Sequence, residues 1–234
     1  MIRLKSGIPG LDELIEGGFP EGSSILLSGG TGTGKSIFCM QYLYYGAKEH
    51  KEPGVYVTLE EGPHNLWWNS QRFKWDLIPL VEKEGLLKIL KFEPGEHMDA
   101  NPVEQIRKIV DRVREAKAKR VVIDSISAFS FWFSDLTKIR YIIYTLIEEL
   151  RNVGCTSILT GETKGHKDDY SAFGVEEFLV DGLVLLYFFP PNRSLFVRKM
   201  RGTKHDQNVH PMLIDDSGMS INPREEVLWE AIKD

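Results

Sequence analysis

The chain has little of what a secreted, metal-bound or membrane-spanning protein needs. Among its 234 residues there are only two cysteines, Cys39 and Cys155, and they form no CxxC pair. This usage suggests neither a disulfide nor a metal site and fits a reducing compartment. The opening residues "MIRLKSGIPG" contain no apolar core of a secretory signal. No apolar run approaches the length that spans a membrane, so we expect a cytoplasmic protein.

An excess of positive charge is also missing. The chain has 29 Lys and Arg against 34 Asp and Glu, which gives a net charge of −5. Phosphate backbones are bound by clusters of cations, so this balance argues against a surface given over to nucleic acid. The segment 163–173, "TKGHKDDYSAF", carries charges of both signs that nearly cancel. We expect a solvated loop there, and nucleic acid is a possible but not a favoured partner.

Low-complexity linkers and internal repeats are absent too, and strand-like and helix-like segments alternate instead. The expected strands are 23–29, 54–61, 86–92, 120–125 and 155–162, and the expected helices are 35–47, 65–75, a helix opened by Pro102, and 137–151. An apolar loop is expected at 129–135, and antiparallel strands from Gly182 onward. Such alternation predicts an α/β fold, a mostly parallel sheet with helices on both faces and C-terminal antiparallel strands. We expect one domain over residues 1–234.

A phosphate-binding loop is the strongest motif. The segment "GGTGTGKS", residues 29–36, matches G-x-x-x-x-G-K-[ST] between an expected strand and an expected helix. Glycines let the backbone N–H groups converge on phosphate oxygens, and the helix N-terminus adds its positive end. Lys35 is expected to reach the β- and γ-phosphates, and Ser36 to offer its hydroxyl to Mg²⁺. The remaining loop residues expected at the phosphates are Gly30, Thr31, Gly32, Thr33 and Gly34.

Acidic residues follow two of the expected strands. Asp124 ends the apolar segment "RVVID", which we expect beside the loop strand. Its carboxylate is a suitable partner for Mg²⁺ and its bound water. Glu60 and Glu61 end another strand, and parallel sheets bind ligands at the carboxyl ends of their strands. Successive strand residues face opposite ways, so we expect Glu60 to orient the attacking water and Glu61 to assist. Glu162, at a third strand end, is a candidate nucleotide sensor.

A row of cations lies in "FVRKMRGTKH", residues 196–205. In an extended chain Lys199 and Arg201 share a face, and Thr203 and His205 join them if the segment stays extended. One interpretation is a charged edge strand that resists aggregation. The other is that the row binds an anion, and the phosphate loop makes this the favoured interpretation.

The combination of segments resembles one family. No N-K-x-D motif that reads guanine is present, so ATP is expected rather than GTP. Together the motifs resemble the KaiC family of RecA-like, circadian-clock ATPases and its archaeal KaiC-like relatives, in "SGIPGLDELIEGGFPEGSSILLSGGTGTGKS", "GVYVTLEEGP", "VVIDSISAF", "FGVEEFLVDGLVLLY" and "KMRGTKH". These segments cover nearly the whole chain in the family's order.

The resemblance implies a ring, usually a hexamer, with ATP between neighbouring subunits. It places Ile37 with the phosphate loop, and Glu60 and Glu61 at the attacking water. It implies that the adjacent subunit contacts ATP through Lys199, Met200, Arg201, Thr203 and His205. Arg201 has the planar fork that suits bidentate phosphate contact, whereas Lys199 is a point charge, and which of them acts stays open.

The chain also departs from KaiC. KaiC carries two such domains in tandem, and this sequence has one. Where the second KaiC domain phosphorylates an adjacent Ser-Thr pair, this chain has Glu177 and Phe178, which resembles the first, purely ATPase domain. The expected function is therefore a Mg²⁺-dependent ATPase switch for an unknown regulatory partner. The alternatives are a DNA-dependent ATPase or recombination factor of the RecA class, a kinase, and a scaffold that holds ATP with negligible turnover.

Overall fold

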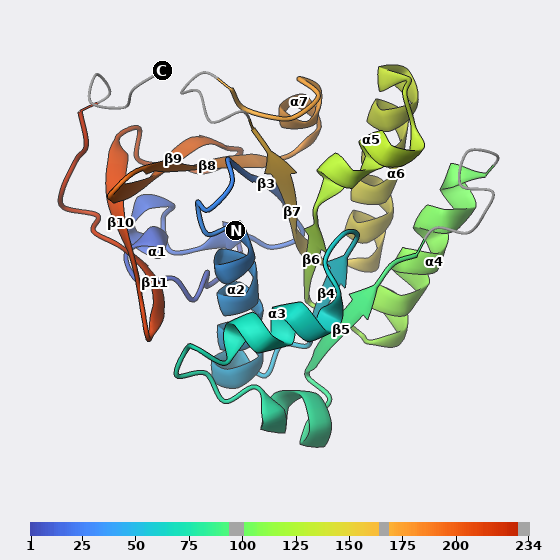
Figure 1. The fold of residues 1–234 in the computed structure, drawn as a ribbon, viewed down its shortest axis with the longest axis horizontal. Coiled ribbons are helices and arrows are strands. Elements are labelled where there is room, and N and C mark those ends of the chain that lie inside the picture. Colours follow the sequence, from blue (N-terminus) through green and yellow to red (C-terminus); the bar gives the residue numbers. More distant parts are fainter. Residues whose placement is uncertain (94–100, 164–168, 229–234) are drawn as a thin grey trace.

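The computed structural model describes residues 1–93, 101–163 and 169–228 (Figure 1). Its strands are β1 (Arg3–Leu4), β2 (Phe19–Pro20), β3 (Ser24–Gly29), β4 (Gly54–Thr58), β5 (Leu87–Lys91), β6 (Arg120–Asp124), β7 (Thr156–Glu162), β8 (Gly182–Phe189), β9 (Asn192–Met200), β10 (Val209–Asp215) and β11 (Gly218–Ile221). Its α-helices are α1 (Leu11–Leu14), α2 (Lys35–His50), α3 (Pro63–Ser70), α4 (Pro102–Glu115), α5 (Phe129–Trp132), α6 (Leu136–Val153) and α7 (Glu176–Leu179).

A nine-stranded sheet organises the molecule, with the order β11-β10-β9-β8-β3-β7-β6-β4-β5. From β8 to β5 all neighbouring strands are parallel, and β9, β10 and β11 are added antiparallel. The expected α/β class with C-terminal antiparallel strands is confirmed. One detail differs, because β8 pairs in parallel with β3 and only its other side is antiparallel.

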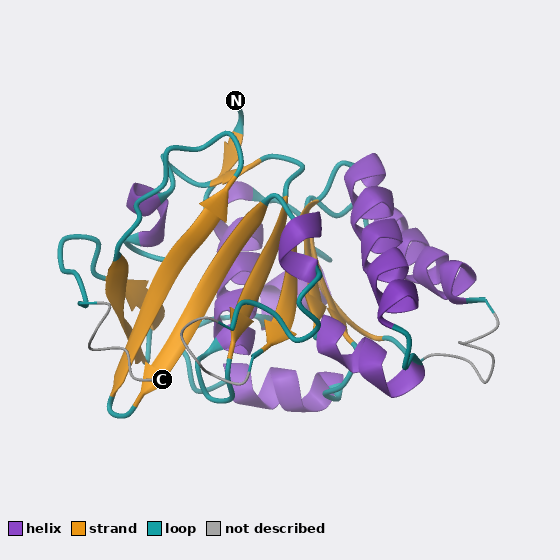
Figure 2. Ribbon diagram, turned by 90° about the horizontal axis from the view of Figure 1, so that it is seen from above, coloured by secondary structure: helices purple, strands orange, loops and turns teal. Residues whose placement is uncertain are grey.

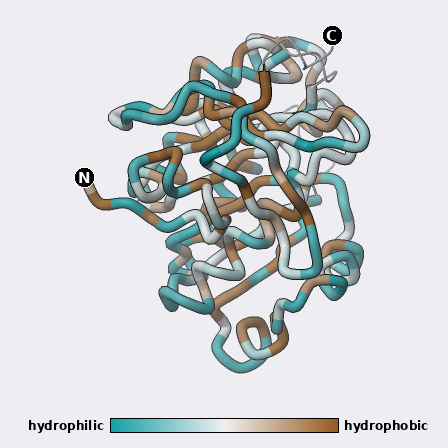
Figure 3. Tube along the Cα trace, turned by 90° about the vertical axis from the view of Figure 1, so that its left-hand side faces the viewer, coloured by the Kyte–Doolittle hydropathy of each residue, from teal (hydrophilic) through white to brown (hydrophobic). Residues whose placement is uncertain are grey.

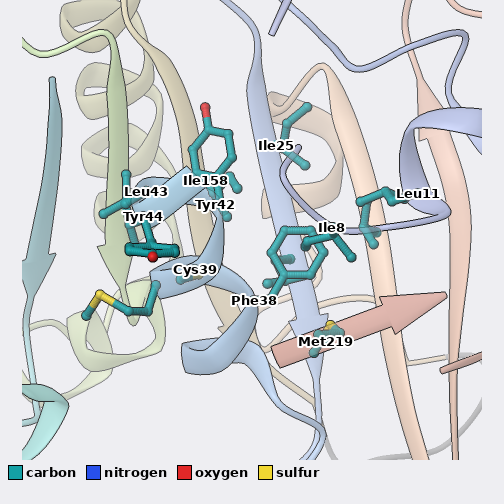
Figure 4. Close-up of a cluster of buried hydrophobic side chains, with 14 of the residues drawn as sticks. Ile8, Leu11, Ile25, Phe38, Cys39, Tyr42, Leu43, Tyr44, Ile158 and Met219 are labelled. Carbon is teal, nitrogen blue, oxygen red and sulfur yellow. The ribbon is translucent and has the colours of Figure 1, made fainter. Parts of the chain in front are cut away.

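Helices cover both faces of this sheet (Figure 2). Buried strands alternate their side chains between two cores, so Val122 of β6 joins one cluster, and Val121 and Ile123 join the other. The first core contains α2, whose Phe38 and Tyr42 lie with Ile25 of β3 in Figure 4. The second core lies under α4 and α6. In Figure 3 the chain is mostly hydrophobic where it crosses the interior and hydrophilic in the outer turns.

The start of α4 and the end of α6 follow the sequence signals, whereas the helix expected over 65–75 is α3, which ends at Ser70. The side chain of Asn101 caps α4 by accepting a hydrogen bond from the Glu104 N–H, and Pro102 occupies the first turn. At the end of α6, Gly154 adopts φ 84°, a left-handed conformation that favours glycine. The segment 129–135 differs from the expectation, since its first four residues form the short helix α5 rather than a loop.

One expectation about strand position was wrong, and so was one of the two interpretations of the cation segment. The strand that ends in Asp124 does not lie beside the loop strand, because β7 is inserted between β3 and β6. The segment with the cations is not at a sheet edge, because β9 pairs with β8 on one side and with β10 on the other. The strand also ends at Met200, and a turn follows, so the row of cations is interrupted after Lys199.

Two further expectations concern membrane-spanning helices and the charged loop 163–173. Throughout the described ranges, no helix has both the length and the apolar character required to cross a bilayer. The charged loop 163–173 was weighed as a DNA contact, but most of its charges, at positions 164–168, lie outside the described residues.

Candidate functional site

The phosphate loop connects the centre of the sheet to the start of α2. Gly32 and Gly34 have φ values of 76° and 103°, which L side chains rarely adopt. At Gly29 an added Cβ would lie 2.6 Å from the carbonyl oxygen of Leu186 on β8. The backbone conformation at Gly32 and Gly34, and the close contact at Gly29, therefore require glycine at these three positions. The Lys35 Nζ donates hydrogen bonds to the carbonyl oxygens of Gly29 (2.8 Å) and Gly30 (3.1 Å), so the lysine is held across its own loop.

Asp124 accepts hydrogen bonds from three hydroxyl groups. Ser36 Oγ donates to its Oδ2 at 3.2 Å, and the Tyr56 hydroxyl donates to the same oxygen. Thr160 donates to the other carboxylate oxygen, Oδ1. Burial, together with the negative charge of Asp124, raises the pKa of Tyr56 well above its usual value, so this tyrosine stays a neutral donor.

The sequence analysis missed Tyr56 and Thr160. Tyr56 is the middle residue of β4 and Thr160 lies in the second half of β7, and these strands are the two neighbours of β6. A hydroxyl-bearing residue within an apolar strand was the available signal. It could not be used without the strand order, because only that order shows which strand ends flank Asp124.

An acidic cavity of about 180 Å³ opens beside the phosphate loop. Loop, acidic and strand-end residues from different parts of the chain meet in it: Thr31, Gly32, Lys35, Ser36, Glu60, Glu61, Asp124, Ser125 and Glu162. Glu60 and Glu61 lie beyond the end of β4 at Thr58, so the alternation argument that separated them does not apply. Both glutamates line the cavity, and Asn69 donates a hydrogen bond to Glu61 Oε1 at 3.3 Å.

The charges in this cavity change one another's protonation. Burial raises the pKa of Glu60, and the negative charges of Glu162 and Asp124 raise it further, while Lys35 opposes them. Burial also raises the pKa of Glu61, with Asp124 as the second cause. The pKa of Lys35 is lowered by burial, although Glu162 and Asp124 favour its charged form. Ionisable groups that shift one another's pKa values within a cavity are typical of functional sites.

The oxygen atoms around Ser36 fit a magnesium ion. Mg²⁺ is bound in such sites by one or two protein oxygens together with phosphate oxygens and water. The Ser36 hydroxyl and the Asp124 carboxylate supply oxygen ligands 3.2 Å apart at the wall of the cavity. Within the described ranges, no group of three or more His, Cys, Asp or Glu has the geometry of a metal site made by protein alone. The donor set therefore suits an ion that arrives with a nucleotide.

The cations of residues 199–205 lie elsewhere. Met200 pairs with Gly182 of β8, and Gly182 pairs with Ile25 of β3. The phosphate loop follows Gly29, about 13 Å further along β3 at ~3.3 Å per residue. These cations thus lie at the amino-terminal ends of the parallel strands β3 and β8, whereas Lys35 follows their carboxyl ends.

Several residues of this segment make hydrogen bonds or core contacts within their own chain. Lys199 Nζ donates to the carbonyl oxygens of Glu177 (3.0 Å) and Val180 (2.7 Å). Thr203 Oγ1 accepts a hydrogen bond from Arg3 at 3.0 Å, and His205 Nδ1 lies 2.8 Å from the Asp206 carbonyl oxygen. The Met200 side chain is buried in the first core.

These features define a P-loop ATPase fold of the RecA-like class. The nucleotide loop lies between a central parallel strand and a helix, and a carboxylate two strands away contacts the loop hydroxyl. The chain belongs to the KaiC family of ATPases, whose family model matches residues 4–226.

Relatives with known sequences or structures agree with this family. A UPF0273 protein of Thermotoga maritima is 37% identical, with 95% of this chain and 97% of that protein covered. The circadian clock oscillator protein KaiC of Synechococcus elongatus is 35% identical over 94% of this chain, which spans only 44% of that protein. A solved structure of a KaiC-like protein from Pyrococcus horikoshii is 41% identical and has a TM-score of 0.83, covering 95% of this chain and 99% of that one.

Proposed function

We propose that this chain is a cytoplasmic, single-domain, Mg²⁺-dependent ATPase that assembles into a ring, with each nucleotide shared by two neighbouring subunits. The observation that supports sharing is the separation of two groups of residues. The acidic cavity contains the groups for metal binding and water activation, whereas the cations of residues 199–205 lie at the opposite ends of the strands. In a head-to-tail ring, the surface with these cations in one subunit meets the cavity of the next. The number of subunits proposed, six, rests on the family resemblance.

Each residue of the cavity then has a chemical role. Lys35 exchanges its two carbonyl partners for the β- and γ-phosphates, and the loop N–H groups hold the phosphate oxygens. Ser36 and Asp124 would hold Mg²⁺, which supplies charge neutralisation on the phosphates when it is bound. Glu60 orients a water molecule for attack on the γ-phosphate and takes up its proton, with Glu61 assisting. Its raised pKa brings its basicity closer to what proton uptake requires.

Arg201 is the better candidate for the cation that acts across the interface. Its side chain is 58% exposed, and its ion pair with Asp181 is long at 3.4 Å. Asp181 is also held by Arg151 at 2.9 Å, so it keeps a partner when Arg201 moves. Lys199, in contrast, is occupied by two carbonyl oxygens. Phosphoryl transfer uses such an arginine to stabilise charge on the γ-phosphate.

Hydrolysis that changes the ring's conformation would act as a switch for a regulatory protein. Self-phosphorylation fits less well, because Glu177 and Phe178 offer no hydroxyl at the position of the KaiC phosphorylation pair. The Glu177 carboxylate is already engaged by the Ser171 hydroxyl, and Phe178 is 63% exposed.

The test is ATP hydrolysis by the wild-type protein with and without Mg²⁺ and with and without single-stranded DNA. We expect Mg²⁺-dependent turnover that DNA does not change, and loss of turnover in Glu60→Gln with ATP binding retained. A scaffold with negligible turnover predicts that Glu60→Gln alters neither rate nor assembly. Strong stimulation by DNA, lost at high salt, would instead favour the recombination class.

The pH dependence of hydrolysis should report the environment of Glu60. Its carboxylate is the active form, so activity falls as pH falls through its pKa, which lies above the usual glutamate value of 4.5. Glu162→Gln removes a neighbouring negative charge, so the acidic limb of the pH–rate profile should move to lower pH. Rates at saturating Mg²⁺ and ATP measure this, with Glu49→Gln on the exposed end of α2 as control. An unmoved limb in Glu162→Gln contradicts the assignment of Glu60 as the base.

A further inference from the structure

The three hydroxyl groups around Asp124 do not use its two oxygens equally. Tyr56 of β4 and Ser36 in the first turn of α2 both donate to Oδ2. Among the described residues, Oδ1 accepts a side-chain hydrogen bond from Thr160 of β7 alone. The carboxylate therefore has one crowded oxygen and one more open oxygen.

The core of the protein fixes the position of Tyr56. Its side chain is 0% exposed and belongs to the first core. Its backbone pairs with Val122 of β6, two residues before Asp124. Side chains two residues apart on a strand share a face, so the tyrosine ring lies along Val122 and its hydroxyl reaches the carboxylate. A ring packed in this way has little freedom to turn its hydroxyl away from Oδ2.

The crowding of Oδ2 limits how Asp124 can bind a cation. A carboxylate has about four lone-pair positions, roughly two on each oxygen. Two hydroxyls fill Oδ2, so Asp124 offers an ion, or the water of an ion, the open position on Oδ1. Mg²⁺ suits such a carboxylate, because it is octahedral, keeps several of its waters and needs few protein oxygens. Ca²⁺ takes about six to eight oxygens and often uses both oxygens of one carboxylate.

We propose that the Tyr56 hydroxyl makes the ion site selective for Mg²⁺ over Ca²⁺, because it fills Oδ2 of Asp124 and prevents binding through both oxygens. Tyr56 is a positioning residue that acts through Asp124. The inference rests on the proposed function for the place of the ion, beside Ser36 and Asp124. Thr160 has a different part, since loss of its hydroxyl opens Oδ1 further and leaves Oδ2 filled.

The experiment measures ADP binding by calorimetry under three conditions: with saturating Mg²⁺, with saturating Ca²⁺, and with a chelator in place of any divalent ion. The wild-type protein should bind ADP more tightly with Mg²⁺ than with Ca²⁺. In Tyr56→Phe the ratio of the two Kd values should fall about tenfold, the effect expected when a group that orients a metal-binding carboxylate is removed. Binding with the chelator should not change, because the phosphate loop is intact.

Two further variants serve as comparisons. Thr160→Val should weaken ADP binding with either ion by a similar factor and keep the ratio, because Oδ2 stays filled. Tyr42→Phe is the matched control, since Tyr42 is also 0% exposed and its hydroxyl donates to the Thr156 carbonyl oxygen at 3.3 Å. We expect no change in Tyr42→Phe under any of the three conditions.

Three results would overturn the inference. The first is a ratio in Tyr56→Phe that equals the wild-type ratio, and the second is a wild-type protein that binds ADP equally tightly with either ion. The third is an equal loss under all three conditions, which would mean that Tyr56 only supports the phosphate loop. ADP is the ligand throughout, so these results leave ATP hydrolysis untouched. A wild-type protein with the expected ion preference that never hydrolyses ATP would refute the ATPase proposal alone.

Discussion

Mixing two inactive variants should restore ATP hydrolysis. Glu60→Gln removes the proposed base and should lower turnover by about a hundredfold or more. Arg201→Ala removes the proposed cation of the neighbour and should lower it by about a thousandfold. In rings assembled from an equal mixture, about one quarter of the interfaces pair an intact Glu60 with an intact Arg201. Turnover should therefore recover to about a quarter of the wild-type value.

The physical reason is the distance between the two groups within one subunit. Arg201 follows the end of β9 that pairs with the start of β8, whereas Glu60 lies at the carboxyl ends of the parallel strands. One subunit cannot bring both to one phosphate, so the variants complement each other only across an interface.

The matched control replaces Arg201→Ala with a double variant that carries both substitutions. Its mixture with Glu60→Gln contains no intact Glu60, so it should stay inactive. Subunit exchange is checked by native mass spectrometry. If exchange is complete and the first mixture also stays inactive, the shared site is wrong.

Replacing Arg120 by methionine should cost about 3–5 kcal/mol in the free energy of unfolding. The arginine side chain is fully buried, and its Nε donates to Glu52 Oε2 at 2.6 Å. Its Nη1 donates to the carbonyl oxygens of Lys5 (2.8 Å) and Tyr42 (3.0 Å). Methionine fills much of the volume but leaves Glu52 and both carbonyl oxygens without this donor, and such a loss of one partner is strongly destabilising.

Urea unfolding of both proteins measures this cost. Lys119→Met is the matched control, because Lys119 is the preceding residue, is 56% exposed and lies 4.0 Å from Glu21 in a surface pair. Surface pairs contribute about 0–1 kcal/mol, so little change is expected there. Equal urea midpoints for Arg120→Met and Lys119→Met would contradict the proposed stabilising role of Arg120. The result bears on the site because β6 begins at Arg120 and presents Asp124 at its other end.

Much of the site could be predicted from local sequence. The phosphate loop needs glycines, a lysine and a hydroxyl at fixed spacing, and all of them lie within one strand–turn–helix unit. The alternation of apolar strands and amphipathic helices likewise predicted the layered α/β fold, because burial of one face of each element requires it. Asp124 and Glu60 were chosen as candidates because ligands of parallel sheets gather at the carboxyl ends of the strands, and both line the cavity.

Strand order was the part that local sequence could not supply. The insertion of β7 between β3 and β6 places Thr160 on one side of Asp124, and β4 places Tyr56 on the other. Pairing of distant strands depends on how the whole chain packs, so the hydroxyl groups around Asp124 emerged only in three dimensions. The same holds for β9, which looked like an edge and is covered by β10.

The sequence by itself determined that this chain builds a phosphate-binding loop in a RecA-like fold, because that information is contained in contiguous residues. The tertiary structure alone decided that Lys199 and Arg201 lie far from that loop, and that Arg193 lies against it. All three are cations on or beside one strand, β9, whose start lies near the phosphate loop and whose end lies at the other end of the parallel strands. Direction and register of pairing, which depend on contacts distant in sequence, therefore decided which cation lies beside the phosphate loop of its own chain.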